Sequence, residues 1–229
     1  MLSKVSVLSL LLVSTVTAYD NGARFARLPT LGWSSWVALG PDASPAVFDY
    51  CDEFSVKAAA DAFIEVGLYD AGYRHFHLDD CWAATERNAS GFLMPEADHF
   101  PNGMKPVVDY VKSKGLVFGL YTCGGPKTCV GNREGSQGHW VEDAQVFAEW
   151  GVEWVKMDWC YGNDILGSYG NMSKALNATG FPIVSYSPNN PIGKGKRVRN
   201  TTVFSGLDLR VSISTQDSTS AKKFRTLIG

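Results

Sequence analysis

The segment Val152–Cys160 reads VEWVKMDWC, an apolar and aromatic run that carries one lysine and one aspartate. Its apolar residues are typical of a buried strand. Because side chains alternate along a strand, Lys156 and Asp158 point to the same side of it. Burying these charges is costly, so they indicate either a structural ion pair or a carboxylate that acts in catalysis. We expect the lysine to lower the pKa of Asp158 and to keep it ionised, as attack on a sugar carbon requires.

Strand and helix patterns alternate on both sides of this segment. Apolar residues recur at helical spacing in four stretches, and a glycine suited to ending a helix follows each of them. The helices are expected around residues 55–67, 104–115, 141–151 and 169–180. The four further strands are expected at Leu31–Trp36, Tyr73–Asp80, Leu116–Thr122 and Pro182–Ser187.

Nearly continuous apolar strands that alternate with helices predict an α/β fold with a parallel sheet. Polar residues gather where these strands end, which is where (β/α)8 barrels carry their chemistry. A doubly wound sheet is the alternative, but no glycine-rich phosphate loop follows the first strand. A sixth strand is expected at Leu207–Ile213 and a last helix at Ser220–Leu227. Five or six strands cannot close a barrel of eight, so we expect an incomplete TIM-type barrel.

The chain has 229 residues and a formal net charge of -2. That length allows one domain with a sizeable core. No global basic field favours nucleic acid, and we interpret the basic segment Asn189–Asn200 as a solvated loop. No segment has the length that a membrane-spanning helix needs. We therefore expect neither nucleic acid nor a membrane as a partner.

The first 18 residues, Met1–Ala18, have the pattern of a secretory signal peptide. Lys4 precedes the apolar run Val5–Val13, and small residues end the segment at Ala18. Residues 19–229 would then form the partial barrel domain. Four Asn-x-Ser/Thr sequons agree with the secretory pathway, at Asn88, Asn171, Asn177 and Asn200. We expect a glycoprotein that is secreted, or lysosomal or vacuolar.

Five cysteines lie beyond the predicted signal peptide, at positions 51, 81, 123, 129 and 160. An oxidising compartment favours disulfides, and the odd count leaves one thiol over. No two cysteines have the C-x-x-C spacing of a structural zinc site, so no metal site is expected there.

Carboxylates follow two of the predicted strands, as the pair Asp79-Asp80 and as Asp158. Together with Lys156 they suit the recognition of a polyol, because charged groups bind hydroxyls and aromatic rings pack on sugars. Calcium is the alternative ligand, but only three carboxylates converge and the lysine would repel a cation. The aromatic candidates beside them are Trp36, Tyr121 and Trp159.

Two histidines, His75 and His77, precede the aspartate pair on the same predicted strand. Such a pair can hold a metal in hydrolases, but that site needs further ligands on later strands. The other histidines, His99 and His139, fall in predicted loops. We therefore interpret His75 and His77 as polar core residues and expect neither a metal nor a cofactor.

Six motifs in unbroken order carry a family resemblance. The chain resembles glycoside hydrolase family 27, the eukaryotic α-galactosidases and α-N-acetylgalactosaminidases. The resemblance runs from about Arg27 to Gly180, and residues 188–229 diverge from the family. The motifs are LGWSSW (31–36), HLDDCW (77–82), FPNGMK (100–105), GLYTCGGPKTCVG (119–131), DAQVFAEWGVEWVKMDWC (143–160) and ALNATG (175–180).

The resemblance implies a retaining (β/α)8 glycosidase that hydrolyses terminal α-galactosides through a covalent glycosyl-enzyme. It implies that Asp158 is the nucleophile and that Lys156 holds substrate. Asp79 and Asp80 would bind the 4- and 6-hydroxyls of galactose, with Trp36 and Tyr121 lining the pocket.

The resemblance also implies a set of disulfides. Cys129 would pair with Cys160 beside the nucleophile, and Cys51 would pair with Cys81. Cys123 would be the free thiol, and a Cys123–Cys129 bridge is the competing pairing.

The chain departs from the family after the fourth helix. In the family the acid/base is the aspartate of R-x-x-x-D. If Arg210 is that substrate-binding arginine, Ser214 stands at the matching position, and Asp217 is the nearest carboxylate. The residues after the fifth strand, which read the sugar's 2-position in the family, are also altered. Three alternatives stay open: an α-galactosidase, an α-N-acetylgalactosaminidase and a truncated galactose-binding product without catalysis. A homodimer is a further expectation.

Overall fold

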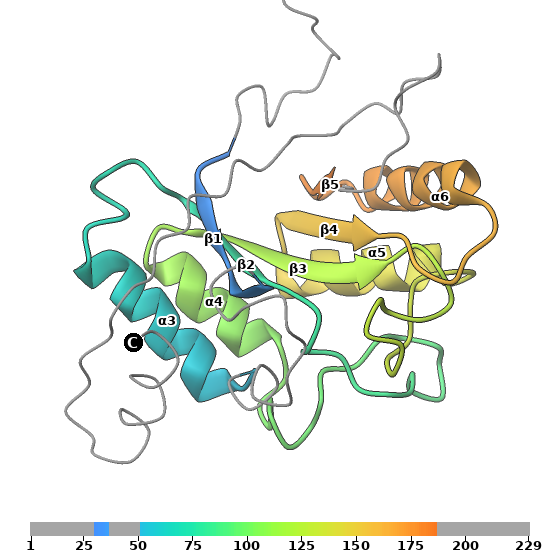
Figure 1. The fold of residues 1–229 in the computed structure, drawn as a ribbon, viewed down its shortest axis with the longest axis horizontal. Coiled ribbons are helices and arrows are strands. Elements are labelled where there is room, and N and C mark those ends of the chain that lie inside the picture. Colours follow the sequence, from blue (N-terminus) through green and yellow to red (C-terminus); the bar gives the residue numbers. More distant parts are fainter. Residues whose placement is uncertain (1–29, 37–50, 187–229) are drawn as a thin grey trace, which may run out of the picture.

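In the computed structural model the described residues are 30–36 and 51–186. They form a five-stranded sheet whose strands lie in sequence order, and each neighbouring pair is parallel (Figure 1). The strands are β1 (Gly32–Ser34), β2 (His75–Leu78), β3 (Val117–Cys123), β4 (Trp154–Asp158) and β5 (Val184–Tyr186). The helices are α3 (Glu53–Glu65), α4 (Lys105–Ser113), α5 (Trp140–Trp150) and α6 (Ile165–Ala178).

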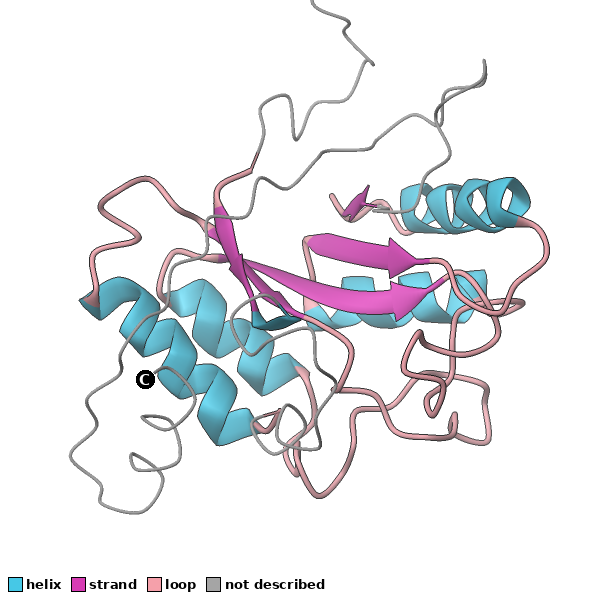
Figure 2. Cartoon of the chain, in the orientation of Figure 1, coloured by secondary structure: helices cyan, strands magenta, loops and turns pink. Residues whose placement is uncertain are grey.

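Each helix connects one strand to the next, as parallel strands require (Figure 2). Consecutive helices contact one another, α3 with α4, α4 with α5 and α5 with α6, so they form one layer over the sheet. This arrangement confirms the predicted α/β class and is part of a (β/α)8 barrel. The predicted sixth strand and last helix lie outside the described residues, as does the predicted signal peptide.

The two faces of the sheet differ in chemistry. Alternate residues of β2 and β3, such as Phe76 and Phe118, are fully buried and belong to the hydrophobic core that includes helix residues. The intervening residues face the other side, because side chains alternate along a strand. On that second face, β2 carries His75 and His77, and β4 carries Lys156 and Asp158. The apolar core therefore lies between strands and helices, and the polar groups lie on the inner face.

The helices begin and end where local chemistry requires it. The side chain of Asp52 accepts a hydrogen bond of 2.7 Å from the Ser55 N–H and caps the start of α3. Asp164 caps α6 in the same way, accepting from the Gly167 N–H. Helix α5 ends at Gly151, whose φ of 79° lies in the left-handed region that glycine adopts without strain.

A buried ion pair that no sequence pattern indicated connects two loops to α5. Arg87, in the loop after β2, donates two hydrogen bonds to the carboxylate of Asp143 in α5, at 2.6 and 2.9 Å. The same guanidinium donates to the carbonyls of Gly91 and Gly135. Asp143 is fully buried, and burial raises the pKa of its carboxyl while the arginine opposes that rise.

None of the described helices is long and apolar enough to cross a bilayer.

Candidate active site

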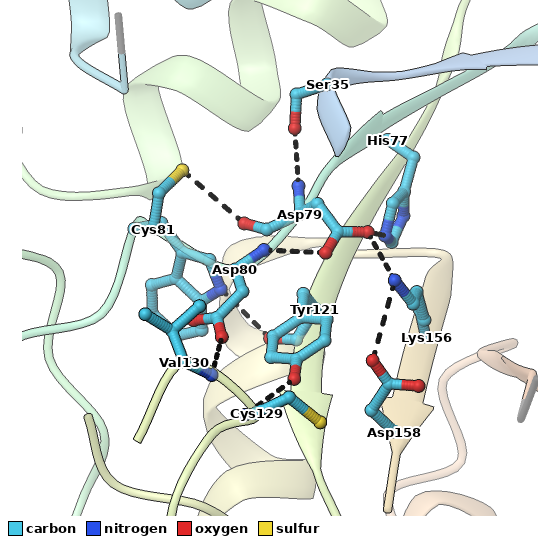
Figure 3. Close-up of polar contacts among 11 residues, drawn as sticks. Ser35, His77, Asp79, Asp80, Cys81, Tyr121, Cys129, Val130, Lys156 and Asp158 are labelled. Carbon is cyan, nitrogen blue, oxygen red and sulfur yellow. Dashed lines mark hydrogen bonds and ion pairs between the residues drawn. The ribbon is translucent and has the colours of Figure 1, made fainter. Parts of the chain in front are cut away.

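Asp79, just beyond β2, is fixed by four contacts, three of them to its carboxylate (Figure 3). Its backbone N–H donates to Ser35 Oγ at 2.8 Å, which connects it to the end of β1. Oδ1 accepts a hydrogen bond of 2.9 Å from the Asp80 N–H. Oδ2 accepts one of 2.7 Å from Lys156 Nζ on β4, and His77 Nε2 lies 3.5 Å from the same oxygen. Three strands therefore define the position of one acid.

Lys156 pairs with two acids, and it lies closer to Asp79 than to Asp158, its neighbour along the strand. Its Nζ lies 2.7 Å from Asp79 Oδ2 and 3.7 Å from Asp158 Oδ2. Burial raises the pKa of the Asp158 carboxyl; Lys156 opposes the rise, and the negative charge of Asp79 adds to it. Lys156 thus lowers the pKa of Asp158 as expected, but the net shift is upward, so the expected net lowering of this pKa is wrong. The reason is that the cation serves two acids, and the desolvation of Asp158 outweighs its share.

The pKa values of the adjacent acids Asp79 and Asp80 shift in opposite directions although both side chains are buried. Burial would raise the pKa of Asp79, but the hydrogen bond from His77 and the charge of Lys156 together hold that pKa at about 2. Burial raises the pKa of Asp80 to about 6, against the hydrogen bond from the Val130 N–H. Asp79 is therefore ionised at neutral pH, whereas Asp80 loses its proton as the pH rises through the mildly acidic range.

Aromatic side chains border the lysine. The Nζ atom of Lys156 lies 5.1 Å from the centre of the Tyr121 ring and 5.7 Å from that of Trp36. Tyr121 lies on β3 in register with Lys156, and its hydroxyl accepts a hydrogen bond of 3.2 Å from the Cys129 N–H. The six candidate residues within the described region therefore lie at one end of the sheet: Trp36, Asp79, Asp80, Tyr121, Lys156 and Asp158. Figure 3 shows all of them except Trp36. Arg210 and Asp217 lie outside the described residues.

Both disulfides implied by the family resemblance are present. Cys129 pairs with Cys160, and Cys51 pairs with Cys81. Cys123 is a buried free thiol, so the competing Cys123–Cys129 bridge is absent. Its Sγ accepts a hydrogen bond of 3.2 Å from the Cys160 N–H, and burial raises its pKa.

The bridge between Cys129 and Cys160 brings the loop after β3 against the loop after β4. The two backbones approach so closely that a Cβ on Gly125 would lie 1.7 Å from the Cys160 carbonyl oxygen. Only glycine can occupy that position without moving the backbone. The same loop presents the Val130 N–H to Asp80 Oδ2 at 3.4 Å, so the disulfide supports the site directly.

Among the described residues, one group has the spacing of metal ligands, the sulfurs of Cys123, Cys129 and Cys160, which lie within 4.8 Å of one another. Two of these sulfurs form a disulfide, so they have no thiolate to offer a metal. The carboxylates instead surround a lysine, an arrangement suited to a neutral ligand rich in hydroxyls.

Sequence reasoning missed two contributors to the site. Ser35 is buried and accepts from the Asp79 N–H, but a serine at the end of a short strand carries no distinguishing pattern. Arg133 is buried, donates to the Ala83 carbonyl oxygen, and its charge lowers the pKa of Asp80. A charged residue in a glycine-rich loop is normally solvated, so its sequence context pointed to the surface.

Comparison with known families adds to this geometry. The family model described as Alpha galactosidase A matches residues 28–206. The chain belongs to this family. An α-galactosidase A of Cellvibrio japonicus is 39% identical over 180 residues, which cover 78% of this chain and 42% of that protein. The α-N-acetylgalactosaminidase of Gallus gallus is 38% identical over 184 residues, 77% of this chain and 44% of the relative. The chain spans less than half the length of the curated relatives it matches.

Solved structures of α-galactosidases share the fold of this chain. α-Galactosidase I from Mortierella vinacea superposes with a TM-score of 0.65 at 35% identity, covering 74% of this chain and 42% of that one. The α-galactosidase of Saccharomyces cerevisiae has a TM-score of 0.63 at 36% identity, covering 69% and 34%. The described sheet thus corresponds to part of the barrel of these enzymes.

Proposed function

We propose that the protein is a retaining α-galactosidase whose nucleophile is Asp158. The observation that carries this proposal is the placement of Asp158 at the end of β4, 3.7 Å from a lysine that is itself bound to Asp79. The 39–40% identity to three relatives named α-galactosidase supports the choice of sugar.

The proposed mechanism has two steps. Asp158 attacks the anomeric carbon as the glycosidic bond breaks, and the leaving oxygen takes a proton from a second carboxylic acid. Water then releases the sugar with the second acid acting as base. In a retaining enzyme the two carboxyl groups lie about 5–5.5 Å apart. Asp217 remains our candidate for the second acid, with Arg210 as a substrate-binding residue beyond the described region.

The roles of the remaining residues follow from their chemistry. Asp79 is ionised and can accept hydrogen bonds from two sugar hydroxyls, while Lys156 donates. Asp80 has a pKa of about 6, so it can act as donor or acceptor in mildly acidic solution. The rings of Trp36 and Tyr121 provide apolar surface for the face of the sugar.

The test is hydrolysis of 4-nitrophenyl α-galactoside by the purified chain between pH 3 and 7. Release of the sugar in its α-anomeric form, followed by NMR, would support a retaining reaction. Labelling of Asp158 by a 2-deoxy-2-fluoro galactosyl fluoride would identify the nucleophile. Absence of turnover by well-folded protein over this pH range would overturn the proposed activity.

An α-N-acetylgalactosaminidase is the second candidate, because the Gallus gallus relative has that name at 38% identity. The ratio of kcat/KM on the 4-nitrophenyl α-glycosides of galactose and N-acetylgalactosamine separates the two enzymes. Binding of galactose without hydrolysis, measured by calorimetry, would instead indicate the non-catalytic alternative.

We further propose that the protein passes through the secretory pathway as a glycoprotein. Three of its four sequon asparagines, Asn88, Asn171 and Asn177, are exposed in the described part of the chain. N-terminal sequencing of the mature protein tests cleavage after Ala18, and a mobility shift after glycosidase treatment tests glycosylation. Light scattering of the same sample tests the proposed homodimer.

A further inference from the structure

His77 lies beneath the proposed sugar-binding acid. It is 2% exposed, and it stands two residues before Asp79, so both side chains project from the same face of β2. Its Nε2 lies 3.5 Å from Asp79 Oδ2, the oxygen that also accepts from Lys156 (Figure 3). The histidine therefore faces an oxygen of this carboxylate from a buried position.

The proton on His77 can be assigned from its neighbours. An ionised carboxylate only accepts hydrogen bonds, so the nitrogen that faces Asp79 must carry a hydrogen. Burial disfavours the charged imidazolium and lowers the pKa of His77. Lys156 already supplies a positive charge to Asp79, and a second one is not required. The neutral tautomer with its hydrogen on Nε2 satisfies these conditions.

The neighbouring strand leaves room for this imidazole. Gly119 of β3 is the register partner of His77, and a Cβ on Gly119 would lie 2.7 Å from His77 Nδ1. On the other side, Gly119 is in register with Trp154 of β4, whose side chain would also crowd that Cβ. A glycine between two large rings shows that the position of His77 depends on the backbone of β3.

We propose that His77 is a positioning residue that donates a hydrogen bond from Nε2 to Asp79 and so orients this acid toward the sugar. This inference rests on the proposed function and gives one interior residue a role in substrate affinity. This role differs from that of a side chain that only fills volume in the core, because it requires a hydrogen-bond donor at Nε2.

A matched pair of variants tests the donor. His77→Gln keeps an N–H near the position of Nε2, whereas His77→Leu keeps much of the volume and removes it. With 4-nitrophenyl α-galactoside, we expect His77→Leu to raise KM about tenfold or more, as loss of a hydrogen bond to a charged group does. We expect His77→Gln to stay within about threefold of the wild type, and kcat to change little in both. Equal effects in the two variants would overturn the proposal.

The pH profile adds a readout that a purely structural role would not move. The charged or titratable groups around His77 are Asp79 and His75 on its own strand, and Lys156 and Asp158 on β4. Without the donor, Asp79 accepts a proton more readily. We therefore expect the acidic limb of kcat/KM to move to higher pH in His77→Leu and to stay in place in His77→Gln. An unmoved limb in His77→Leu would contradict the proposal.

A measurement on the wild-type chain is independent of activity and of variant folding. In a long-range ¹H–¹⁵N spectrum of the imidazoles, His77 should show a protonated Nε2 and a bare Nδ1 at pH 7. A hydrogen on Nδ1 would overturn the proposal even if the enzyme is active. If the wild type hydrolyses no galactoside, the proposed function fails, and the tautomer still decides the inference.

Discussion

The two acids at the ends of β2 and β4 compete for one lysine. Alternation along a strand placed Lys156 and Asp158 on one side, and the structure agrees. The same pattern could not show that Lys156 binds Asp79 at 2.7 Å, because these two residues are 77 positions apart in the chain. Spacing within one strand predicts the side of the strand to which a side chain points. The ion-pair partner of that side chain on another strand depends on how the sheet curves.

We predict that Asp158→Asn abolishes hydrolysis, with a fall in kcat of at least about a thousandfold and little change in melting temperature. The amide keeps the shape of the carboxylate but is not a nucleophile. Turnover of a chromogenic α-galactoside and circular dichroism are the measurements. Asp70→Asn, at an exposed turn, is the matched control and should keep full activity. Activity of Asp158→Asn close to that of the wild type would place the nucleophile elsewhere.

At the scale of elements, Arg87 holds two loops against α5 through a buried carboxylate. We predict that Arg87→Ala lowers the free energy of unfolding by about 3–5 kcal/mol, because it leaves the buried Asp143 carboxylate without its cation. Urea denaturation measures the change.

A double variant separates the ion pair from the packing around it. Arg87→Met with Asp143→Leu removes both charges and retains apolar volume, so it should recover most of the stability lost in Arg87→Ala. A double variant as unstable as Arg87→Ala would show that the hydrogen bonds to the Gly91 and Gly135 carbonyls dominate instead.

The disulfide between the loops after β3 and β4 gives a second prediction at this scale. Replacing both Cys129 and Cys160 by alanine should lower the free energy of unfolding by about 2–4 kcal/mol, because the bridge spans 31 positions. KM should rise as well, since the freed loop carries the donors to Tyr121 and Asp80.

The other disulfide provides the comparison. The Cys51–Cys81 bridge spans 30 positions, so its removal should cost a similar amount of stability. Urea denaturation and steady-state kinetics on both double variants give the comparison. An unchanged KM after loss of Cys129–Cys160 would contradict the supporting role of that loop.

Element order and type could be predicted from the sequence, but element length could not. The strand expected at Leu31–Trp36 extends only over Gly32–Ser34, and the one expected to begin at Pro182 begins at Val184. Leu31 and Pro182, which begin the two expected strands, are exposed and lie outside the sheet although both are apolar. A strand ends where its neighbour stops pairing with it, which the run itself does not record. The periodicity of each helix, by contrast, is local, and four helices appear where they were expected.

At the scale of the whole molecule, the raised pKa of Asp80 couples stability to pH. The folded pKa is about 6 and the ordinary value is 3.8, so between them the folded chain holds a proton that the unfolded chain has lost. The contribution of Asp80 is therefore present at low pH and lost as pH rises through about 6. We predict that Asp80→Asn gains stability relative to the wild type between pH 4 and 6.5, by up to about 3 kcal/mol.

Urea denaturation at four or five pH values measures this difference, which also cancels the opposite contribution of His75, whose pKa burial lowers to about 4. Asp70→Asn should show no such trend. A difference between Asp80→Asn and wild type that does not vary with pH would contradict the assignment.

The shared lysine has a consequence for the course of the proposed reaction. Three carboxylates surround Lys156, and two of them, Asp79 and Asp158, are its direct partners. Forming an ester at Asp158 would neutralise one partner, so the repulsion between the acids would fall and the ammonium would turn wholly to Asp79. The Asp79 carboxylate would then be held by the whole ammonium charge while the sugar is covalently attached, which would keep the sugar ring oriented for the attack of water.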